Sequence, residues 1–481
     1  MQVDGTSRQG TSSGNGDASI DMVRLVKSIR EKLDKLYSPS PECYIYKVPK
    51  KLKKINEEAY TPLRVSIGPL HHGKEGLEDM EELKLRYFND FMQRSGKSLE
   101  ELVKIMKEME GAIRKCYAET INFESETFLE IILVDAAFII EFLLRQWFLP
   151  LITPNDLIFR KPCMKIDISY DLLLLENQLP FFVLQYLFEM SNINLDINDY
   201  ETMPDKFIFL TVHFLRCLNI VPEFPPLEKI NPSRVNHFLD LLRSCLIPME
   251  DSQASVPEEI RHSKVKQFID FLRCFMPRRS LQQTETKFKI PSATALKIPS
   301  ATELHEAGVK FEVSSSKNLF DIKFRGNILE IPHTRIVDVT ESLLRNIIAY
   351  EEYHCDAQFF GDYTMIMDYL INTNEDVDLL VRAQIIDNWL GDNNDVSNLF
   401  KGLSKEVTIS NIFYFTELHR DLNNYCESPS NKRKVIFYKW KATLRQDYCN
   451  TPWRVLSITV AAILLGLTFI QSLCSLVSCN K

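Results

Sequence analysis

Apolar residues recur every three to four positions along most of this chain, which is the spacing of one face of an α-helix. Near the N-terminus, residues 20–36 place Ile, Val and Leu on one face and Lys and Arg on the opposite face. We interpret this segment as an amphipathic helix with a solvated basic face; the alternative is a helix lying on an acidic membrane surface. Further helices are predicted over residues 78–93, 99–120, 125–147, 170–190 with a kink near Pro180, 206–218, 235–246 and 265–275, and again from Thr340 onward.

Alternation of apolar and polar residues, which is typical of strands, appears clearly in one region. Strands are expected over 311–313, 320–324 and 328–331, with Gly326 and Asn327 forming the turn between the last two. The sequence therefore predicts a mainly α fold, in which a large helical domain carries a small β-hairpin insertion.

Two segments outside these elements set the expected domain boundaries. Residues 1–19 are rich in Gly and Ser and are expected to be disordered, so the helical domain would cover residues 20–450. Residues 276–304 are interpreted as a linker, because the octapeptide at 289–296 recurs almost intact at 297–304 and surface loops tolerate such insertions.

The C-terminal stretch over residues 455–477 has no charged residue, and thirteen of its residues are Leu, Ile, Val or Phe. At 1.5 Å per residue it would extend roughly 35 Å, which exceeds a bilayer core of about 30 Å. The equally apolar stretch over 125–147 carries five charged side chains and is expected to be a core helix instead. Residues 455–477 are therefore expected to form a transmembrane helix.

Four residues follow the uncharged stretch, and basic residues gather before it rather than beyond it. This asymmetry agrees with the positive-inside rule. The expected location is a single-pass, tail-anchored membrane protein, with its large domain in the cytosol.

Composition narrows the classes of function. The chain of 481 residues is 45% hydrophobic and 25% charged, with a net charge of −8, so it offers no broad basic face for nucleic acid. Its eleven cysteines include no Cys-x-x-Cys pair and are interpreted as reduced core thiols.

Residues 68–75, Gly-Pro-Leu-His-His-Gly-Lys-Glu, nearly match a phosphate-binding loop. Glu75 stands where a hydroxyl should bind magnesium, and Pro69 removes one amide donor, so a structural turn is favoured over nucleotide binding. His71 and His72 lack a zinc-ligand pattern. Asp392 begins a sequence resembling a calcium loop that lacks the required Gly and Glu, and we interpret it as a loop that ends a helix. No cofactor, metal site or small-molecule substrate is assigned.

Asp135 and Glu176 are the most interesting acids, because each lies inside an apolar run. A buried carboxylate can be catalytic, but more often it pairs with an Arg or accepts backbone amides. Structural roles are favoured for both, and no catalytic residue is assigned.

Several blocks of the sequence resemble the plant family known as Domain of Unknown Function 247. They occur in order along nearly the whole chain: Val48-Pro49, Ala59 to Pro62, Ser66 to Pro69, His71-His72, Leu133 to Asp135, Phe138 to Glu141, Asp171 to Phe182, Ala301 to Leu304, Ala307 to Phe311, Asn346 to Glu351, and Pro452-Trp453. Leu70, where an aromatic residue is more usual, and the duplicated octapeptide depart from the pattern. The resemblance implies a plant membrane protein of unsettled biochemistry, in a family linked to self-incompatibility recognition in grasses, and it supplies no catalytic residues.

Three functions are compatible with these features. The first is a membrane-anchored, non-enzymatic interaction protein with unidentified protein partners, acting in recognition or signalling. The second is a membrane-tethered hydrolase that uses Asp135 or Glu176. The third is a cell-surface, receptor-like recognition protein of the self-incompatibility type.

Overall fold

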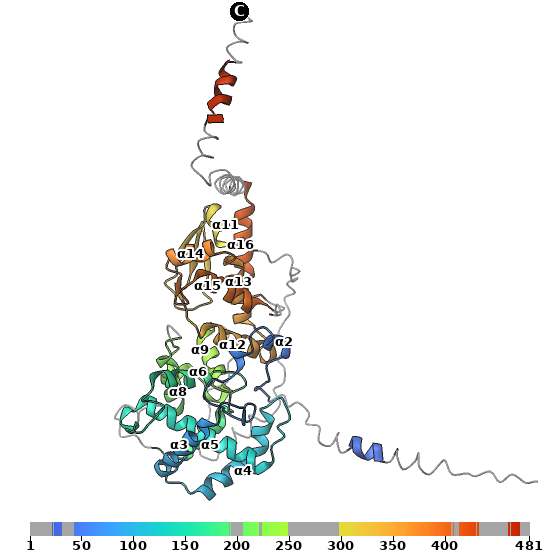
Figure 1. Cartoon of the computed structure of the whole chain (residues 1–481), viewed down its shortest axis with the longest axis vertical. Coiled ribbons are helices and arrows are strands. Elements are labelled where there is room, and N and C mark those ends of the chain that lie inside the picture. The colour runs from blue at the N-terminus through green and yellow to red at the C-terminus, as the bar shows by residue number, and fades with distance from the viewer. Residues whose placement is uncertain are drawn as a thin grey trace, which may run out of the picture.

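The computed structural model describes residues 22, 24–30, 43–191, 193, 205–220, 224–248, 298–405, 407, 413–429, 431, 460–461 and 463–471. The main body is elongated, with two parts stacked along its long axis (Figure 1). The lower part carries α3, α4, α5, α6 and α8, and the upper part carries α11 and α13 to α16, with α2, α9 and α12 between them. One continuous hydrophobic core runs through both parts.

The first part of the chain is helical except for an extended segment before α3. Its elements are α2 (Lys50–Lys53), η1 (Glu58–Tyr60), α3 (Asp79–Ser95), α4 (Leu99–Lys115), α5 (Ser125–Trp147), η2 (Leu149–Leu151), α6 (Pro162–Asp171), α7 (Phe181–Met190), α8 (Lys206–Cys217), η3 (Leu227–Lys229), η4 (Pro232–Arg234) and α9 (Phe238–Leu246). Helix α5 is central, because α3, α4, α7 and α8 all pack against it. Every residue from Ile131 to Arg145 is buried, as expected for a core helix.

The second part of the chain combines helices with two small sheets. Its elements are α11 (Ala301–Glu306), β1 (Lys310–Val313), β2 (Lys323–Arg325), β3 (Ile328–Ile331), β4 (Thr334–Ile336), α12 (Thr340–His354), α13 (Phe359–Leu370), α14 (Asn374–Arg382), β5 (Ile386–Asn388), α15 (Asn393–Ser404) and α16 (Thr416–Glu427). Strand β3 pairs antiparallel with β2, through the predicted turn at Gly326 and Asn327, and parallel with β1. Strands β4 and β5 form a separate parallel pair.

The helices predicted over 78–93, 125–147 and 206–218 are confirmed as α3, α5 and α8. The prediction of one kinked helix over 170–190 is wrong, because residues 172–180 separate α6 from α7 and Pro180 is the N-cap of α7. The residue before a proline avoids helical geometry, which favours a break over a kink. The second copy of the repeat is also not a simple linker, because Ser300 caps α11 through a capping box with Glu303.

The prediction of a transmembrane helix over residues 455–477 is wrong. Among the residues described, none of the helices is both long and apolar enough to cross a membrane. Within that range the structure describes residues 460–461 and 463–471. The rest of that range lies outside the described residues, as do residues 1–19, the predicted helix over 265–275 and most of the predicted linker. The cytosolic, tail-anchored location stays a prediction.

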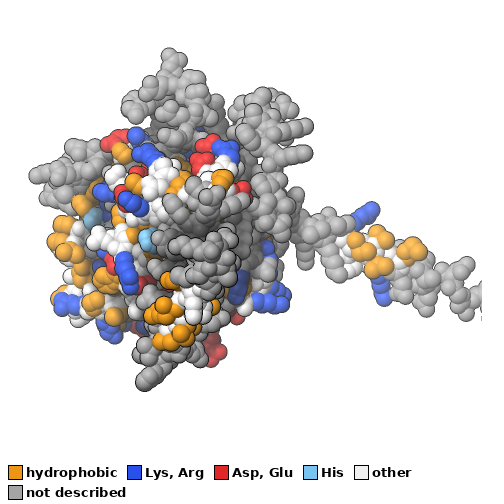
Figure 2. Space-filling model, turned by 90° about the horizontal axis from the view of Figure 1, so that it is seen from above, with side chains coloured by type: hydrophobic (Ala, Val, Ile, Leu, Met, Phe, Trp, Pro, Cys, Tyr) orange, Lys and Arg blue, Asp and Glu red, His pale blue; other side chains and the backbone are white. Residues whose placement is uncertain are grey.

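The face seen along the long axis from above is chemically mixed (Figure 2). Lys and Arg side chains there are interspersed with Asp and Glu and with hydrophobic side chains, rather than forming a continuous patch.

Candidate functional site

Residues 44–72, which include α2 and η1 but are otherwise irregular, cross the middle of the molecule and are held by polar side chains from other elements. We call these side chains, together with Gln178 of the loop between α6 and α7, the polar seam: Asp135, Asp171, Glu176, Asn177, Gln178 and Asn346. All six are buried. Among the described residues, the strand-like pairing of this segment is an isolated β-bridge between Ile45 and Tyr117. Its buried amides therefore need partners other than a strand ladder, since an unpaired buried N–H is costly.

Two members of the polar seam bind a run of consecutive amides. Asp171 accepts the N–H of Leu63 at 2.8 Å through Oδ1, and those of Arg64 and Val65 at 2.7 and 2.8 Å through Oδ2. Asn177 Oδ1 accepts the N–H of Ile67 at 2.7 Å. The end of α6 and the loop that follows it thereby fix the backbone of residues 63–67.

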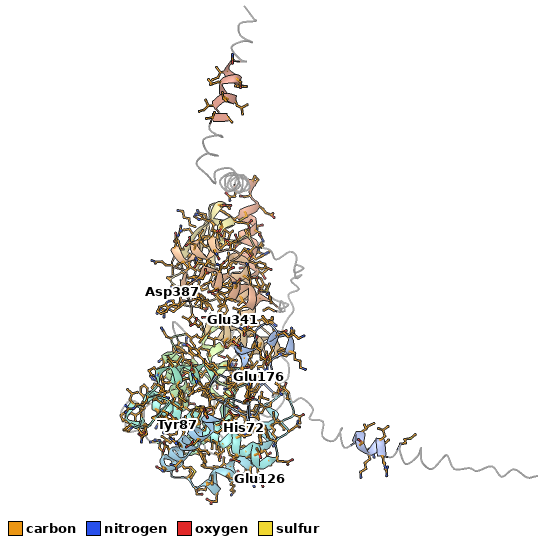
Figure 3. The ribbon with its side chains drawn as sticks, viewed as in Figure 1. His72, Tyr87, Glu126, Glu176, Glu341 and Asp387 are labelled. Atoms are coloured by element: carbon orange, nitrogen blue, oxygen red, sulfur yellow. The ribbon has the colours of Figure 1, made fainter. Side chains whose placement is uncertain are left out.

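Glu176, one of the two acids singled out in the sequence, lies near the centre of the molecule (Figure 3). Its Oε1 accepts the N–H of Val48 at 2.6 Å, and its Oε2 lies 2.9 Å from Lys53 Nζ and 3.1 Å from His71 Nε2. Burial opposes ionisation, but the contacts with His71, Lys53 and the Val48 amide outweigh it and lower the pKa of Glu176. The carboxylate is therefore held ionised by the Lys53 ammonium, the His71 ring and a backbone amide.

Asp135, the other acid, projects from the middle of α5. Its Oδ1 lies 2.7 Å from Lys84 Nζ, and its Oδ2 accepts the N–H of Gly68 at 2.8 Å. Lys84 is fully buried and also lies 2.7 Å from Glu81. Burial lowers the pKa of Lys84, but the attraction of Asp135 and the hydrogen bonds to both acids more than offset this and raise it. Asp135 and Lys84 thus form a buried ion pair linking α3 to α5.

The amide side chains of the seam make a full set of hydrogen bonds. Asn177 Nδ2 donates to the carbonyls of Val65 and Asp171, both at 2.9 Å. Gln178 Nε2 donates to the carbonyls of Leu172 and Leu174 at 2.7 and 2.8 Å. Such complete pairing removes the usual cost of burying polar groups.

Asn346 connects the seam to the second part of the chain. From α12, its Oδ1 accepts the N–H of Leu175 at 2.8 Å, and its Nδ2 donates to the carbonyl of Ala59 at 2.8 Å. Sequence reasoning placed Asn346 and Asp171 in family blocks without assigning them a role. Both are polar residues inside apolar runs, which is the same feature that singled out Glu176 in the sequence.

The loop that resembles a phosphate cradle has its first amide already bound, because Gly68 donates to Asp135. Its two histidines point to different partners: His71 contacts Glu176, and the His72 ring lies 5.7 Å from the Phe123 ring. In the part of the chain that the structure describes, no three His, Cys, Asp or Glu side chains are grouped as a metal site. The prediction that the loop at Asp392 ends a helix is wrong: Asp392 is the N-cap that begins α15, and it accepts the N–H of Asn394 at 2.9 Å.

A second site, missed in the sequence, lies at the end of the β4–β5 sheet. The Trp389 side chain is 65% exposed, and the Arg335 guanidinium lies 5.3 Å from its ring centre. Arg335 Nε donates to Asp387 at 3.1 Å, and the backbone N–H of Trp389 donates to Ile336 at 2.9 Å. Hydrogen bonds from Trp389 and Arg335 lower the pKa of Asp387. Asp387 lies at the outer edge of the upper part (Figure 3), so these three residues present an ordered indole to solvent.

Comparison with known proteins gives consistent matches over most of the chain. The model of the family DUF247, described as plant protein of unknown function, matches residues 45–467. UPF0481 protein At3g47200 of Arabidopsis thaliana is 30% identical over 448 residues, which cover 91% of this chain and 87% of that protein. Putative UPF0481 protein At3g02645 of the same plant is 26% identical over 513 residues, covering 94% of this chain and 93% of that protein. No solved structure matches the chain.

Proposed function

The chain belongs to the DUF247 family of plant proteins of unknown function, and from that premise we propose that it is a non-enzymatic interaction protein acting in recognition or signalling. The observation that carries the proposal is the ordered, exposed side chain of Trp389. Tryptophan and arginine are the residues most enriched at energetic centres of protein interfaces. An exposed indole fixed by Arg335 and Asp387 would lose little conformational entropy on binding.

The proposed occupant of this surface is a different protein with an apolar pocket large enough for an indole. The mixed charges around Trp389, which include Arg335 and Asp387, do not favour a phosphate backbone. The interspersed charges of the face in Figure 2 and the net charge of −8 agree with that choice. A second copy of the same chain is the competing occupant, and measuring the mass of the purified protein in solution distinguishes it.

The hydrolase alternative needs an acid that faces a substrate beside a second titratable group. Asp135 and Glu176 each have both oxygens engaged, in contacts that hold residues 44–72 and α3. These contacts account for both acids as structural residues, which weakens the case for a catalytic role. Turnover by the purified chain, lost in Glu176→Gln with the fold intact, would overturn the non-enzymatic proposal.

The test compares three forms of the full chain in plant cells by proximity labelling: wild type, Trp389→Ser and Leu99→Ser. Leu99 is also an exposed apolar residue, but it lies at the start of α4 in the lower part. We expect a set of proteins labelled by wild type and Leu99→Ser and lost with Trp389→Ser. Direct binding of one such protein to the purified chain should weaken at least about 10-fold in Trp389→Ser, as for an interface centre.

Identical labelling by all three forms would contradict the assignment of this surface. If the partners that depend on Trp389 are extracellular, the receptor-like alternative replaces the cytosolic one, and the role of Trp389 in recognition stands.

A further inference from the structure

Helix α8 ends in a cysteine that faces a histidine one turn earlier. Cys217 is exposed, and its Sγ lies 3.4 Å from His213 Nε2. Residues four apart lie on the same face of a helix, so the helix itself holds the pair together. A thiol within reach of an imidazole can transfer its proton to it, which leaves the nucleophilic thiolate.

Side chains from two other helices complete the surroundings of this pair. The Trp147 ring meets the His213 ring edge-on, with centres 4.7 Å apart, and so fixes the imidazole from the end of α5. Gln146 hydrogen-bonds the Cys217 sulfur, and Lys165 of α6 adds a positive charge nearby. Gln146 Oε1 and Trp147 Nε1 are buried and have no hydrogen-bond partner.

The hydrogen bond from His213 lowers the pKa of Cys217 against the opposing effect of partial burial, and Gln146 and Lys165 add to the lowering. Other thiols of the chain behave in the opposite way. Burial raises the pKa of both Cys245 and Cys355 to about 12. Cys217 is thus set apart from these core thiols by its exposure, its partner and its charge environment.

We propose that Cys217 is a site of reversible S-thiolation by an anionic low-molecular-weight disulfide, with His213 as the base that accepts the thiol proton. The Cys217 thiolate attacks one sulfur of the disulfide, whose S–S bond breaks as the new mixed disulfide forms. The departing thiolate takes up the proton that His213 received, so the disulfide is the oxidant and no further reactant is needed. Lys165 and the exposed Arg216 favour an anionic disulfide over a cationic one.

The experiment treats the reduced, full-length chain with oxidised glutathione or with cystamine, an anionic and a cationic disulfide, and follows each cysteine by peptide mass spectrometry. Cys163 serves as the internal control, because it is exposed on α6 in the same molecule. For each unit by which a pKa falls, the thiolate fraction rises about 10-fold and its nucleophilicity falls about threefold. For each unit of lowering, Cys217 should therefore react about threefold faster than Cys163 at pH 7, and it should react faster with oxidised glutathione than with cystamine.

In His213→Asn the rate at Cys217 should fall about threefold at pH 7, and the midpoint of its pH–rate profile should move upward. Equal rates at Cys217 and Cys163, or a preference for cystamine, would overturn the proposal. So would an unchanged profile in a folded His213→Asn protein. If that variant does not fold, the pH–rate profiles of Cys217 and Cys163 in the wild-type protein provide the test. The proposal predicts a lower midpoint at Cys217, and an equal or higher midpoint would overturn it.

Discussion

Gly68 donates its backbone N–H to Asp135 Oδ2 at 2.8 Å, and it can do so because it lies in the left-handed region with φ of +71°. A Cβ atom at this position would lie 2.8 Å from the carbonyl oxygen of Gln178 and 3.1 Å from the Tyr117 hydroxyl. The glycine therefore lets the chain approach both α5 and the loop between α6 and α7. Gly68 therefore links Asp135 on α5 to the loop that carries Glu176, Asn177 and Gln178.

Gly68→Ala should be destabilising, because it adds both backbone strain and a clash with a carbonyl oxygen. We expect the free energy of unfolding to fall by about 3 kcal/mol, measured by urea denaturation. Gly73→Ala is the matched control, since Gly73 has a similar φ of +75° but open space around its Cβ position. The control should lose about 1 kcal/mol, from strain alone. Equal losses in the two variants would show that the close approach at Gly68 costs nothing.

Lys84→Met should be among the most destabilising substitutions on α3, because it leaves Asp135 buried without its cation. The expected loss is about 3–5 kcal/mol. In the double variant Lys84→Met, Asp135→Asn, the asparagine oxygen can still accept the Gly68 amide, so part of that loss should be recovered.

Arg86→Met is the control on the same helix, because Arg86 pairs with Glu82 in an exposed position. Its effect should stay within about 0.5 kcal/mol. If Lys84→Met is no worse than Arg86→Met in urea denaturation, the buried ion pair does not stabilise the fold in the way described.

The stability of the second part of the chain should depend on the protonation of Asp362. Burial, with a smaller contribution from the charge of Glu351, raises the pKa of Asp362 to about 7. The folded state then binds this proton more tightly than the unfolded state, whose aspartate has a pKa of about 3.9. The contribution is favourable below about pH 4 and is lost as pH rises to about 7.

Asp362→Asn removes this titration and keeps an oxygen that can accept the Tyr414 amide, which Asp362 Oδ2 accepts at 2.7 Å in the wild type. Relative to wild type, the variant should therefore gain stability between pH 5 and pH 8, by up to about 2.6 kcal/mol. The control is Asp392→Asn, at an exposed helix cap. Thermal or urea unfolding at the two pH values measures the difference, and a variant that tracks wild type at both would refute the assignment.

The local elements of this fold could be predicted from the sequence, because each depends on neighbouring residues. Helix α5 matches its prediction from Ser125 to Trp147, since the apolar run has clear polar limits. The β2–β3 hairpin follows from the turn at Gly326 and Asn327. The strand predicted over residues 320–324 begins too early, because β2 starts at Lys323. Phe320 instead packs against Phe360 and Tyr363 in the core.

What the sequence could not supply was the pairing of distant segments. Glu176 binds the Val48 amide 128 positions away, and Asn346 binds the Leu175 amide 171 positions away. The periodicity of apolar residues along the sequence predicts local helices and strands, but it does not predict which distant segments contact each other. Strands β4 and β5 have three residues each, which is too short for an alternation pattern, so the surface at Trp389 that depends on them was also missed. Structural roles were favoured for Asp135 and Glu176, with Arg or backbone amides as the expected partners. The amides are confirmed, but the cationic partners are Lys84 and Lys53.

The central claim is that the polar seam exists to hold residues 44–72 in place, and hydrogen exchange in Asn177→Ala tests it most directly. This substitution removes the acceptor of the Ile67 amide and both donors from Asn177 Nδ2. The account predicts that amides of residues 63–68 lose protection while those of α13 and α15 keep theirs, with Asn394→Ala on the exposed start of α15 as the control. Unchanged protection at residues 63–68 in a folded Asn177→Ala protein would contradict it.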